Sequence, residues 1–397
     1  IVQGNGKIFA ASENAVFVYN IASEELETIT TLNGLSGDFI STIHYSEIYK
    51  LLIIGYGNGL VEVYNELDKS VLTVVDILDK TTIPPDNKSI NHFLEYNELI
   101  YISTDFGISV YNLERLEFGD TYFVGNGGTQ IIVNSTAVVG DYIYAACENP
   151  NGLIRALVAS ENLIDYQSWE QIVSGEFLAL QANQDKLFTT RLNNKIYEVN
   201  GNAIIELFTY SNTPLDIKST ESNLIVTTKT QAYIYDNTFT LITIANTSSE
   251  FEADFTSAVI VNEAIYIGSL GFGVLKSMIG DITNYEDIYP NGPLRNDVFS
   301  IQAGFSNVWV TYGAYSLTYF PFNRRYGTSH LLDEWNNISY DSLQFPAFSL
   351  NYTSINPFKP QQVFISSFQH GILEIDNDIP ITMYNNLNSG LESLIIP

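Results

Sequence analysis

The chain has 397 residues and carries a net charge of −28, because 45 acidic residues outnumber 17 basic ones. This excess of negative charge argues against nucleic acid as a partner, since binding to nucleic acid depends on Lys and Arg side chains that neutralise phosphates. It also disfavours direct adsorption to bare anionic lipid.

A strand ending recurs in the first third of the chain. Residues 18–20, 63–65 and 110–112 all read Val-Tyr-Asn, at intervals of 45 and 47 residues. Recurrence at this period indicates an array of similar structural units. Each copy begins with an apolar run, passes a Gly or Asn turn and ends in an alternating aromatic strand, which predicts a β-hairpin. We expect nine such hairpins, at residues 7–20, 51–65, 99–112, 142–157, 187–200, 224–236, 265–276, 308–320 and 363–376.

Further short apolar strands flank several of these hairpins, for example at residues 40–44 and 71–78. Four antiparallel strands in about 44 residues is the content of a β-propeller blade. The sequence therefore predicts an all-β protein with a seven-bladed β-propeller over residues 1–283. Residues 284–397 are expected to start a second propeller, with two blades and the truncated opening of a third. We expect the biological chain to be longer at both ends.

No catalytic or metal-binding pattern stands out. The only cysteine, Cys147, lies in an apolar run, which predicts burial, and no run of 18 apolar residues predicts a transmembrane segment. Asp376, Asn377 and Asp378 could suggest a calcium loop, but the spaced Gly and terminal Glu are missing, which favours a plain turn. We therefore expect no enzyme activity, no catalytic residue, no cofactor and no metal. The four histidines are expected at core or turn positions: His44, His92, His330 and His370.

One segment has the composition of a binding site. Residues 319–326 read Tyr-Phe-Pro-Phe-Asn-Arg-Arg-Tyr, and Trp335 follows shortly afterwards. Arginines among aromatic rings can bind carboxylate or phosphate while the rings stack on a sugar or a side chain. Arg324, Arg325, Tyr326 and Trp335 are therefore candidate binding residues in a long loop after the eighth hairpin. Alternatively, the same residues could pack at a junction between two propellers.

A second signature precedes some of the blades. Asn33-Gly34-Leu35-Ser36 is followed by apolar residues seven and ten positions after the Asn, and so is Asn291-Gly292-Pro293-Leu294. Residues 388–391, Asn-Ser-Gly-Leu, are followed by Ile395 at the first of these offsets. This pattern resembles the Asn-Gly-Leu blade signature of two-component-regulator-type propellers, which are common in Bacteroidota.

The whole chain also resembles the amino-terminal part of PorZ-like proteins of the type IX secretion system. The resemblance rests on residues 4–19, 31–59, 90–121 and 287–299. It implies two propellers before a carboxy-terminal β-sandwich, and a place on the cell surface, at the outer membrane, in the attachment complex. It further implies the sortase PorU, the barrel PorV and PorQ as partners, and binding of lipopolysaccharide for presentation to the sortase.

Two other functions are compatible with the same propellers. They could form the periplasmic sensor domain of a two-component regulator, which would continue into a membrane helix. They could also form a surface propeller that binds or cleaves glycans.

Overall fold

The computed structural model describes residues 1–247, 253–295, 297–304, 306–318 and 320–394. They form nine four-stranded antiparallel sheets, in each of which consecutive strands are neighbours. The predicted all-β fold is thereby confirmed. The chain divides into two compact units, Ile1–Pro290 and Asn291–Pro397. None of the helices found among the described residues has the length and apolar character needed to span a membrane.

The first unit contains seven sheets. The first sheet consists of β1 (Val2–Gly4), β2 (Lys7–Ala11), β3 (Val16–Asn20) and β4 (Leu26–Ile29). The second consists of β5 (Ile40–Ser46), β6 (Leu51–Tyr56), β7 (Val61–Asn65) and β8 (Val71–Val74). The third consists of β9 (Ile90–Tyr96), β10 (Leu99–Thr104), β11 (Gly107–Asn112) and β12 (Glu117–Tyr122). The fourth consists of β13 (Val133–Val139), β14 (Tyr142–Cys147), β15 (Leu153–Leu157) and β16 (Glu170–Val173).

Three more sheets complete the first unit. The fifth consists of β17 (Ala179–Asn183), β18 (Lys186–Arg191), β19 (Lys195–Asn200) and β20 (Ala203–Thr209). The sixth consists of β21 (Pro214–Ser219), β22 (Asn223–Thr228), β23 (Gln231–Asp236) and β24 (Leu241–Asn246). The seventh consists of β25 (Asp254–Val261), β26 (Ala264–Leu270), β27 (Gly273–Met278) and β28 (Asp281–Ile288).

The second unit contains two sheets. The eighth consists of β29 (Ser300–Ala303), β30 (Val308–Thr311), β31 (Thr328–Leu331) and β32 (Trp335–Ile338). The ninth consists of β33 (Leu350–Ile355), β34 (Gln362–Ser367), β35 (Gly371–Asp376) and β36 (Ile379–Tyr384). Helix in the described residues is limited to four 3₁₀ turns: η1 (Thr31–Asn33), η2 (Pro85–Asn87), η3 (Tyr166–Ser168) and η4 (Asp341–Leu343). Ile395, part of the expected opening of a tenth unit, lies outside the described residues.

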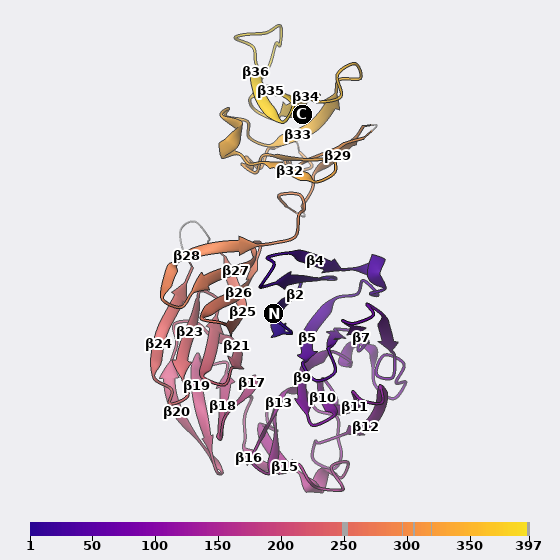
Figure 1. Cartoon of the computed structure of the whole chain (residues 1–397), viewed down its shortest axis with the longest axis vertical. Coiled ribbons are helices and arrows are strands. Elements are labelled where there is room, and N and C mark those ends of the chain that lie inside the picture. The colour runs from indigo at the N-terminus through magenta and orange to yellow at the C-terminus, as the bar shows by residue number, and fades with distance from the viewer. Residues whose placement is uncertain (248–252, 296, 305, 319, 395–397) are drawn as a thin grey trace. The chain divides into compact units, whose positions relative to one another are not determined.

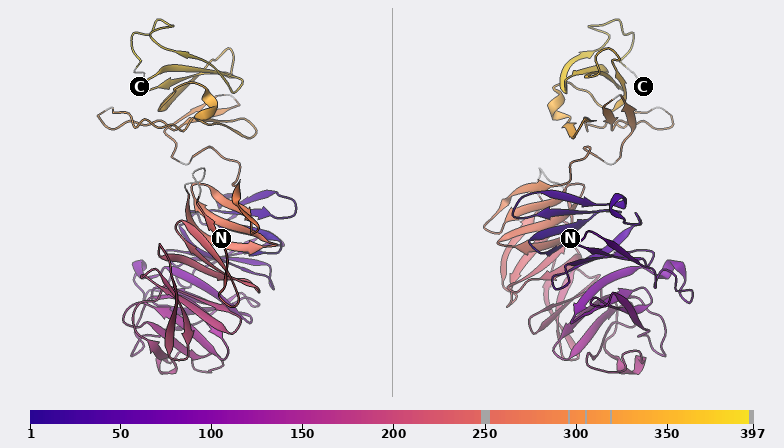
Figure 2. Two further views of the ribbon diagram at one scale, coloured as in Figure 1. Left: turned by 90° about the vertical axis from the view of Figure 1, so that its left-hand side faces the viewer. Right: turned by 45° about the vertical axis from the view of Figure 1, so that its right-hand side comes forward.

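The seven sheets of the first unit are arranged in a ring (Figure 1). The first strand of each sheet contacts the first strand of the next, and β25 of the seventh sheet contacts β1 of the first. In both views of Figure 2 the indigo first sheet lies beside the orange seventh sheet. Buried side chains of both sheets, including Ile8, Tyr19, Val259 and Tyr266, form one apolar cluster that closes the ring.

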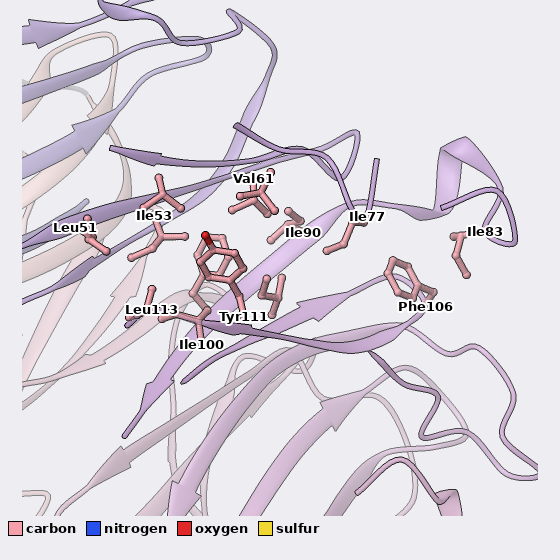
Figure 3. Packing of buried hydrophobic residues seen from close by; sticks show 14 residues of the cluster. Leu51, Ile53, Val61, Ile77, Ile83, Ile90, Ile100, Phe106, Tyr111 and Leu113 are labelled. Atoms are coloured by element: carbon pink, nitrogen blue, oxygen red, sulfur yellow. The ribbon is translucent and has the colours of Figure 1, made fainter. Parts of the chain in front are cut away.

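The apolar core lies between neighbouring sheets. Figure 3 shows the cluster between the second and third sheets, where Ile53 and Val61 face Ile100 and Tyr111. Tyr111 belongs to one of the three Val-Tyr-Asn repeats, and each repeat ends the third strand of its sheet. Face-to-face packing of twisted sheets is how a propeller buries the apolar faces of its blades.

The predicted eighth hairpin, residues 308–320, is wrong in its second strand. β30 pairs instead with β31, which begins only at Thr328. The intervening residues form a side hairpin, in which Tyr315 bridges to Pro321. Gly327, with a φ of 80°, directly precedes the third strand. The described aromatic residues Tyr315, Phe320 and Phe322 therefore belong to an insertion between the second and third strands.

Candidate binding pocket

The insertion between β30 and β31 carries most of the predicted binding residues. Its last part is fixed to the connection before β33, because the Ser349 backbone N–H donates to the Arg324 carbonyl oxygen at 2.8 Å. In return, the Arg324 backbone N–H donates to the Ser349 hydroxyl at 3.2 Å. Ser349 is buried, so these two bonds hold the backbone of the arginine pair at a defined place on the second unit. Tyr319, at the start of the predicted patch, lies outside the described residues.

A pocket of about 420 Å³ lies beside this segment. All of its lining residues belong to the second unit: Leu294, Arg295, Arg325, Tyr326, Ser339, Tyr340 and Asp341. Two of the four predicted binding residues, Arg325 and Tyr326, are therefore brought together in one hollow.

The arginines are held against aromatic rings. The Arg295 guanidinium lies 4.1 Å from the centre of the Tyr326 ring. The Arg325 guanidinium lies 4.4 Å from the centre of the Phe348 ring and 5.7 Å from that of Tyr340. Such cation–π contacts are individually weak, but they restrict the planes of the guanidinium groups.

Arg324 lies next to the pocket but does not line it. Its Nη1 donates to Asp297 Oδ2 at 3.0 Å, and Arg295 Nε donates to Asp297 Oδ1 at 2.6 Å. One carboxylate therefore pairs with two guanidinium groups, while Arg324 also lies 5.6 Å from the centre of the Tyr326 ring.

Trp335, the fourth predicted residue, is not part of the pocket. It begins β32, and its backbone N–H donates to Asn291 Oδ1 at 2.9 Å. Sequence reasoning missed Arg295 and Tyr340, which complete the pocket. A signal for Arg295 was present, since it directly follows the Asn-Gly-Pro-Leu signature and is one of only 17 basic residues.

A second hollow, of about 740 Å³, lies at the centre of the first unit and is lined by the first strands of its seven sheets. The side chains of His44 and Glu95 meet across two of these strands, with Nε2 and Oε2 2.9 Å apart. The Ser46 hydroxyl donates to the same carboxylate at 2.7 Å. Burial, with a smaller contribution from nearby His44, lowers the pKa of His92 to about 4, so His92 is neutral at physiological pH.

Asp376 ends β35, and Asn377 and Asp378 form the turn to β36. The carboxylates of this segment already have cationic or polar partners: Asp376 pairs with Lys359, and Asp378 Oδ1 lies 2.7 Å from His330 Nδ1. Among the described residues, no group of three or more His, Cys, Asp or Glu side chains could hold a metal ion. Cys147 is buried in the fourth sheet, as expected from its apolar context, and burial raises the pKa of its thiol.

The closed ring of four-stranded sheets, with one hollow at its centre and another on the second unit, defines a β-propeller protein. Residues 8–170 match the family model described as the N-terminal β-propeller domain of PorZ, of the type IX secretion system. The resemblance to PorZ-like proteins inferred from the sequence is thereby confirmed. No curated protein sequence gives a significant match.

Two of the matching solved structures illustrate the shared fold. One is PorZ of Porphyromonas gingivalis, described as an essential bacterial surface component of its type IX secretion system. It superimposes with a TM-score of 0.73 at 17% identity, over 98% of this chain and 52% of PorZ, so this chain spans about half of the PorZ length. The other is the Cps50 (Swd1) β-propeller domain of Myceliophteria thermophila, with a TM-score of 0.52 at 9% identity, over 70% of this chain and 97% of that domain.

Proposed function

We propose that this chain is part of a non-enzymatic cell-surface scaffold in the attachment complex of a type IX secretion system. The observation that carries the proposal is the match of residues 8–170 to the PorZ N-terminal propeller domain. The likeness of the whole fold to PorZ supports it, because 98% of this chain is covered. A rigid propeller exposes large, preformed surfaces without moving parts, which suits a protein that holds others in place.

In this role, the protein lies on the outer face of the outer membrane. It binds lipopolysaccharide and presents it to the sortase PorU, together with the barrel PorV and PorQ. The net charge of −28 favours partner surfaces rich in Lys and Arg, because opposite potentials speed encounter and exclude wrong partners.

Affinity capture from outer membranes tests the scaffold role. Tagged full-length protein, solubilised in mild detergent, is expected to bring down the sortase and the barrel, identified by mass spectrometry. A tagged outer-membrane protein of similar acidity serves as the control for non-specific capture. Recovery of neither partner, with the tagged protein intact, contradicts the scaffold role.

The pocket on the second unit favours one second candidate, a surface propeller that binds glycans for another purpose. Arginines and tyrosines around a hollow of about 420 Å³ suit an anionic sugar whatever complex the protein belongs to. The two functions separate in the capture experiment, since a solitary glycan-binding protein would recover polysaccharide without sortase or barrel.

A further inference from the structure

We propose that the pocket bounded by Arg295, Arg325, Tyr326 and Tyr340 binds the anionic group of a saccharide, a phosphate or a carboxylate. Arg325 supplies the principal contact. This inference deepens the proposed function and rests on it in one respect only, namely that the saccharide belongs to lipopolysaccharide.

The distribution of arginine is the first argument. The chain has six arginines, and three of them, Arg295, Arg324 and Arg325, lie at this one place. The three elsewhere have a hydrogen-bond acceptor or a carboxylate nearby within the fold. Arg155 Nε donates to Glu170 at 2.5 Å, Arg191 Nε donates to the Glu176 carbonyl oxygen at 3.3 Å, and Arg115 lies 3.9 Å from Glu117.

Arg325 differs from these arginines in its polar contacts. Within the part of the chain that the structure describes, its guanidinium has no hydrogen-bond acceptor and no carboxylate partner. Its contacts there are the rings of Phe348 and Tyr340. A guanidinium whose face lies on an aromatic ring keeps its N–H donors free, because the donors lie in the plane of the group. The planar fork of Arg325 is therefore available to two oxygens of an incoming anion.

The local charge supports an anionic ligand. Arg295, Arg324 and Arg325 carry three positive charges, and Asp297 and Asp341 carry two negative ones, which leaves an excess of one positive charge. This excess occurs on a chain whose net charge is −28. A positive site on a protein that repels anions elsewhere concentrates them at that site.

The remaining lining favours a sugar as the carrier of the anion. The Tyr326 and Tyr340 rings offer apolar surface beside hydroxyl groups, and Ser339 adds another hydroxyl. Sugars present hydroxyl groups and C–H surfaces in the same way, whereas an acyl chain would need a continuous apolar lining. The volume of about 420 Å³ lies within the usual range of ligand pockets.

Binding is measured by calorimetry on the full chain with three probes: glucose 6-phosphate, glucuronate and glucose. We expect at least one anionic probe to bind more tightly than glucose. Tighter binding of glucose 6-phosphate assigns the site to phosphate, and tighter binding of glucuronate assigns it to carboxylate. Equal binding of all three probes, or binding of none, overturns the proposal.

Three variants test the role of Arg325. Arg325→Gln is expected to weaken binding of the anionic probe by about 10- to 30-fold, as for a central charged contact. Arg325→Lys keeps the positive charge but loses the planar pair of N–H donors. Its affinity for the anionic probe should therefore lie between those of the wild type and Arg325→Gln. The control Arg115→Gln makes the same change of net charge on the first unit and should leave affinity unchanged.

Melting temperature separates a binding role from a packing role. Arg325→Gln should have the same melting temperature as the wild type, because the substitution removes no hydrogen bond within the described residues. A lower melting temperature with unchanged affinity would show that Arg325 packs structurally, and would overturn the proposal.

The outcomes for the pocket and for the scaffold are distinguishable. If Arg325→Gln no longer binds the anionic sugar, and the tagged wild-type full-length protein captures the sortase, both proposals stand. If the wild type binds the anionic sugar but captures neither sortase nor barrel, the pocket stands and the scaffold role fails.

Discussion

The side-chain amide of Asn134 donates to the carbonyl oxygen of Phe177 at 2.8 Å, and this bond joins the fourth sheet to the segment that enters the fifth. Asn91, at the same position of the preceding sheet, donates to the Val133 carbonyl oxygen at 3.0 Å. Ser41, one sheet earlier, donates to the Ile90 carbonyl oxygen at 2.6 Å. Three successive sheet boundaries are thus bridged by a polar side chain next to the first apolar residue of the strand.

Removal of such a bridge should destabilise the ring. Asn134→Ala leaves the Phe177 carbonyl without this donor, and we expect a loss of about 1 to 3 kcal/mol in the free energy of unfolding. Urea denaturation followed by circular dichroism measures the loss. Asn126→Ala, in an exposed turn, is the matched control and should change stability by less than about 0.5 kcal/mol. Equal midpoints for the two variants would refute a role for the bridge.

The buried carboxylate of Glu62 predicts a specific pH dependence. Glu62 is 1% exposed and accepts hydrogen bonds from Tyr56 Oη and, at 3.0 Å, from the Ser36 backbone N–H. Burial raises the pKa of Glu62, and the bonds from Tyr56 and Ser36 offset part of that rise. In the folded protein the Glu62 carboxyl group therefore keeps its proton to a higher pH than in the unfolded chain. As a result, the contribution of Glu62 to the free energy of unfolding falls as the pH rises through and above the ordinary pKa of a glutamate.

Glu62→Gln removes this titration, so its stability relative to wild type should increase between about pH 3 and pH 7. Tyr56→Phe removes an offsetting hydrogen bond and should steepen the decline instead. Denaturation curves collected across this range give both differences. Profiles parallel to that of the wild type would contradict the predicted shift.

The contact between His330 and Asp378 predicts a stability effect in the second unit. His330 is 3% exposed, lies with its ring 4.2 Å from that of Trp309, and connects the eighth sheet to the ninth through Asp378. Asp378→Gly removes the carboxylate while tolerating the local φ of 60°. We expect the free energy of unfolding of the second unit to fall by about 1 to 3 kcal/mol, because His330 Nδ1 stays buried without this partner.

Hydrogen exchange of the β31 amides in the full chain measures this effect. The control is Asn377→Gly, which has a φ of 50° at the neighbouring position and whose side chain bonds only to Asp376 in the described structure. Equal protection of β31 in the two variants would argue against the contact between the sheets.

The backbone conformation of Gly371 predicts that a larger residue at this position would destabilise the fold. Gly371 begins the third strand of the ninth sheet with a φ of 100°, and a Cβ there would overlap the Tyr384 carbonyl oxygen. Gly371→Ala should therefore lower the free energy of unfolding by at least about 2 kcal/mol. Gly390→Ala, where a Cβ meets no atom within 4 Å, should be nearly neutral. Thermal melts compare the pair, and a neutral Gly371→Ala would exclude strain at this position.

Much of the fold follows from local patterns. The Val-Tyr-Asn endings locate third strands because alternation with period two and a turn-forming Asn act within a few residues. The prediction of the eighth hairpin fails because Tyr315 and Phe320 are residue types typical of strands but belong to an insertion. Only pairing with the rest of the sheet, at Thr328, distinguishes the two.

The candidate pocket was partly accessible from the sequence. Arg325 and Tyr326 were found because they are adjacent and compositionally unusual. Arg295 was missed because its approach to Tyr326 depends on how the chain enters the eighth sheet, and no local spacing encodes that. The bridges of Asn91 and Asn134 left a readable signal, an Asn directly after the first apolar residue of two successive inner strands.

The contact of β1 with β25 couples the two ends of the first unit. A nascent chain can form its early sheets one by one as they emerge, but the first sheet gains its second neighbour only when the strands up to Ile288 exist. Until then one apolar face, which includes Ile8 and Tyr19, stays open to water. Because contacts so distant in sequence form late and slowly, that face stays open to non-native association for longer than the faces between sheets that follow one another in the chain.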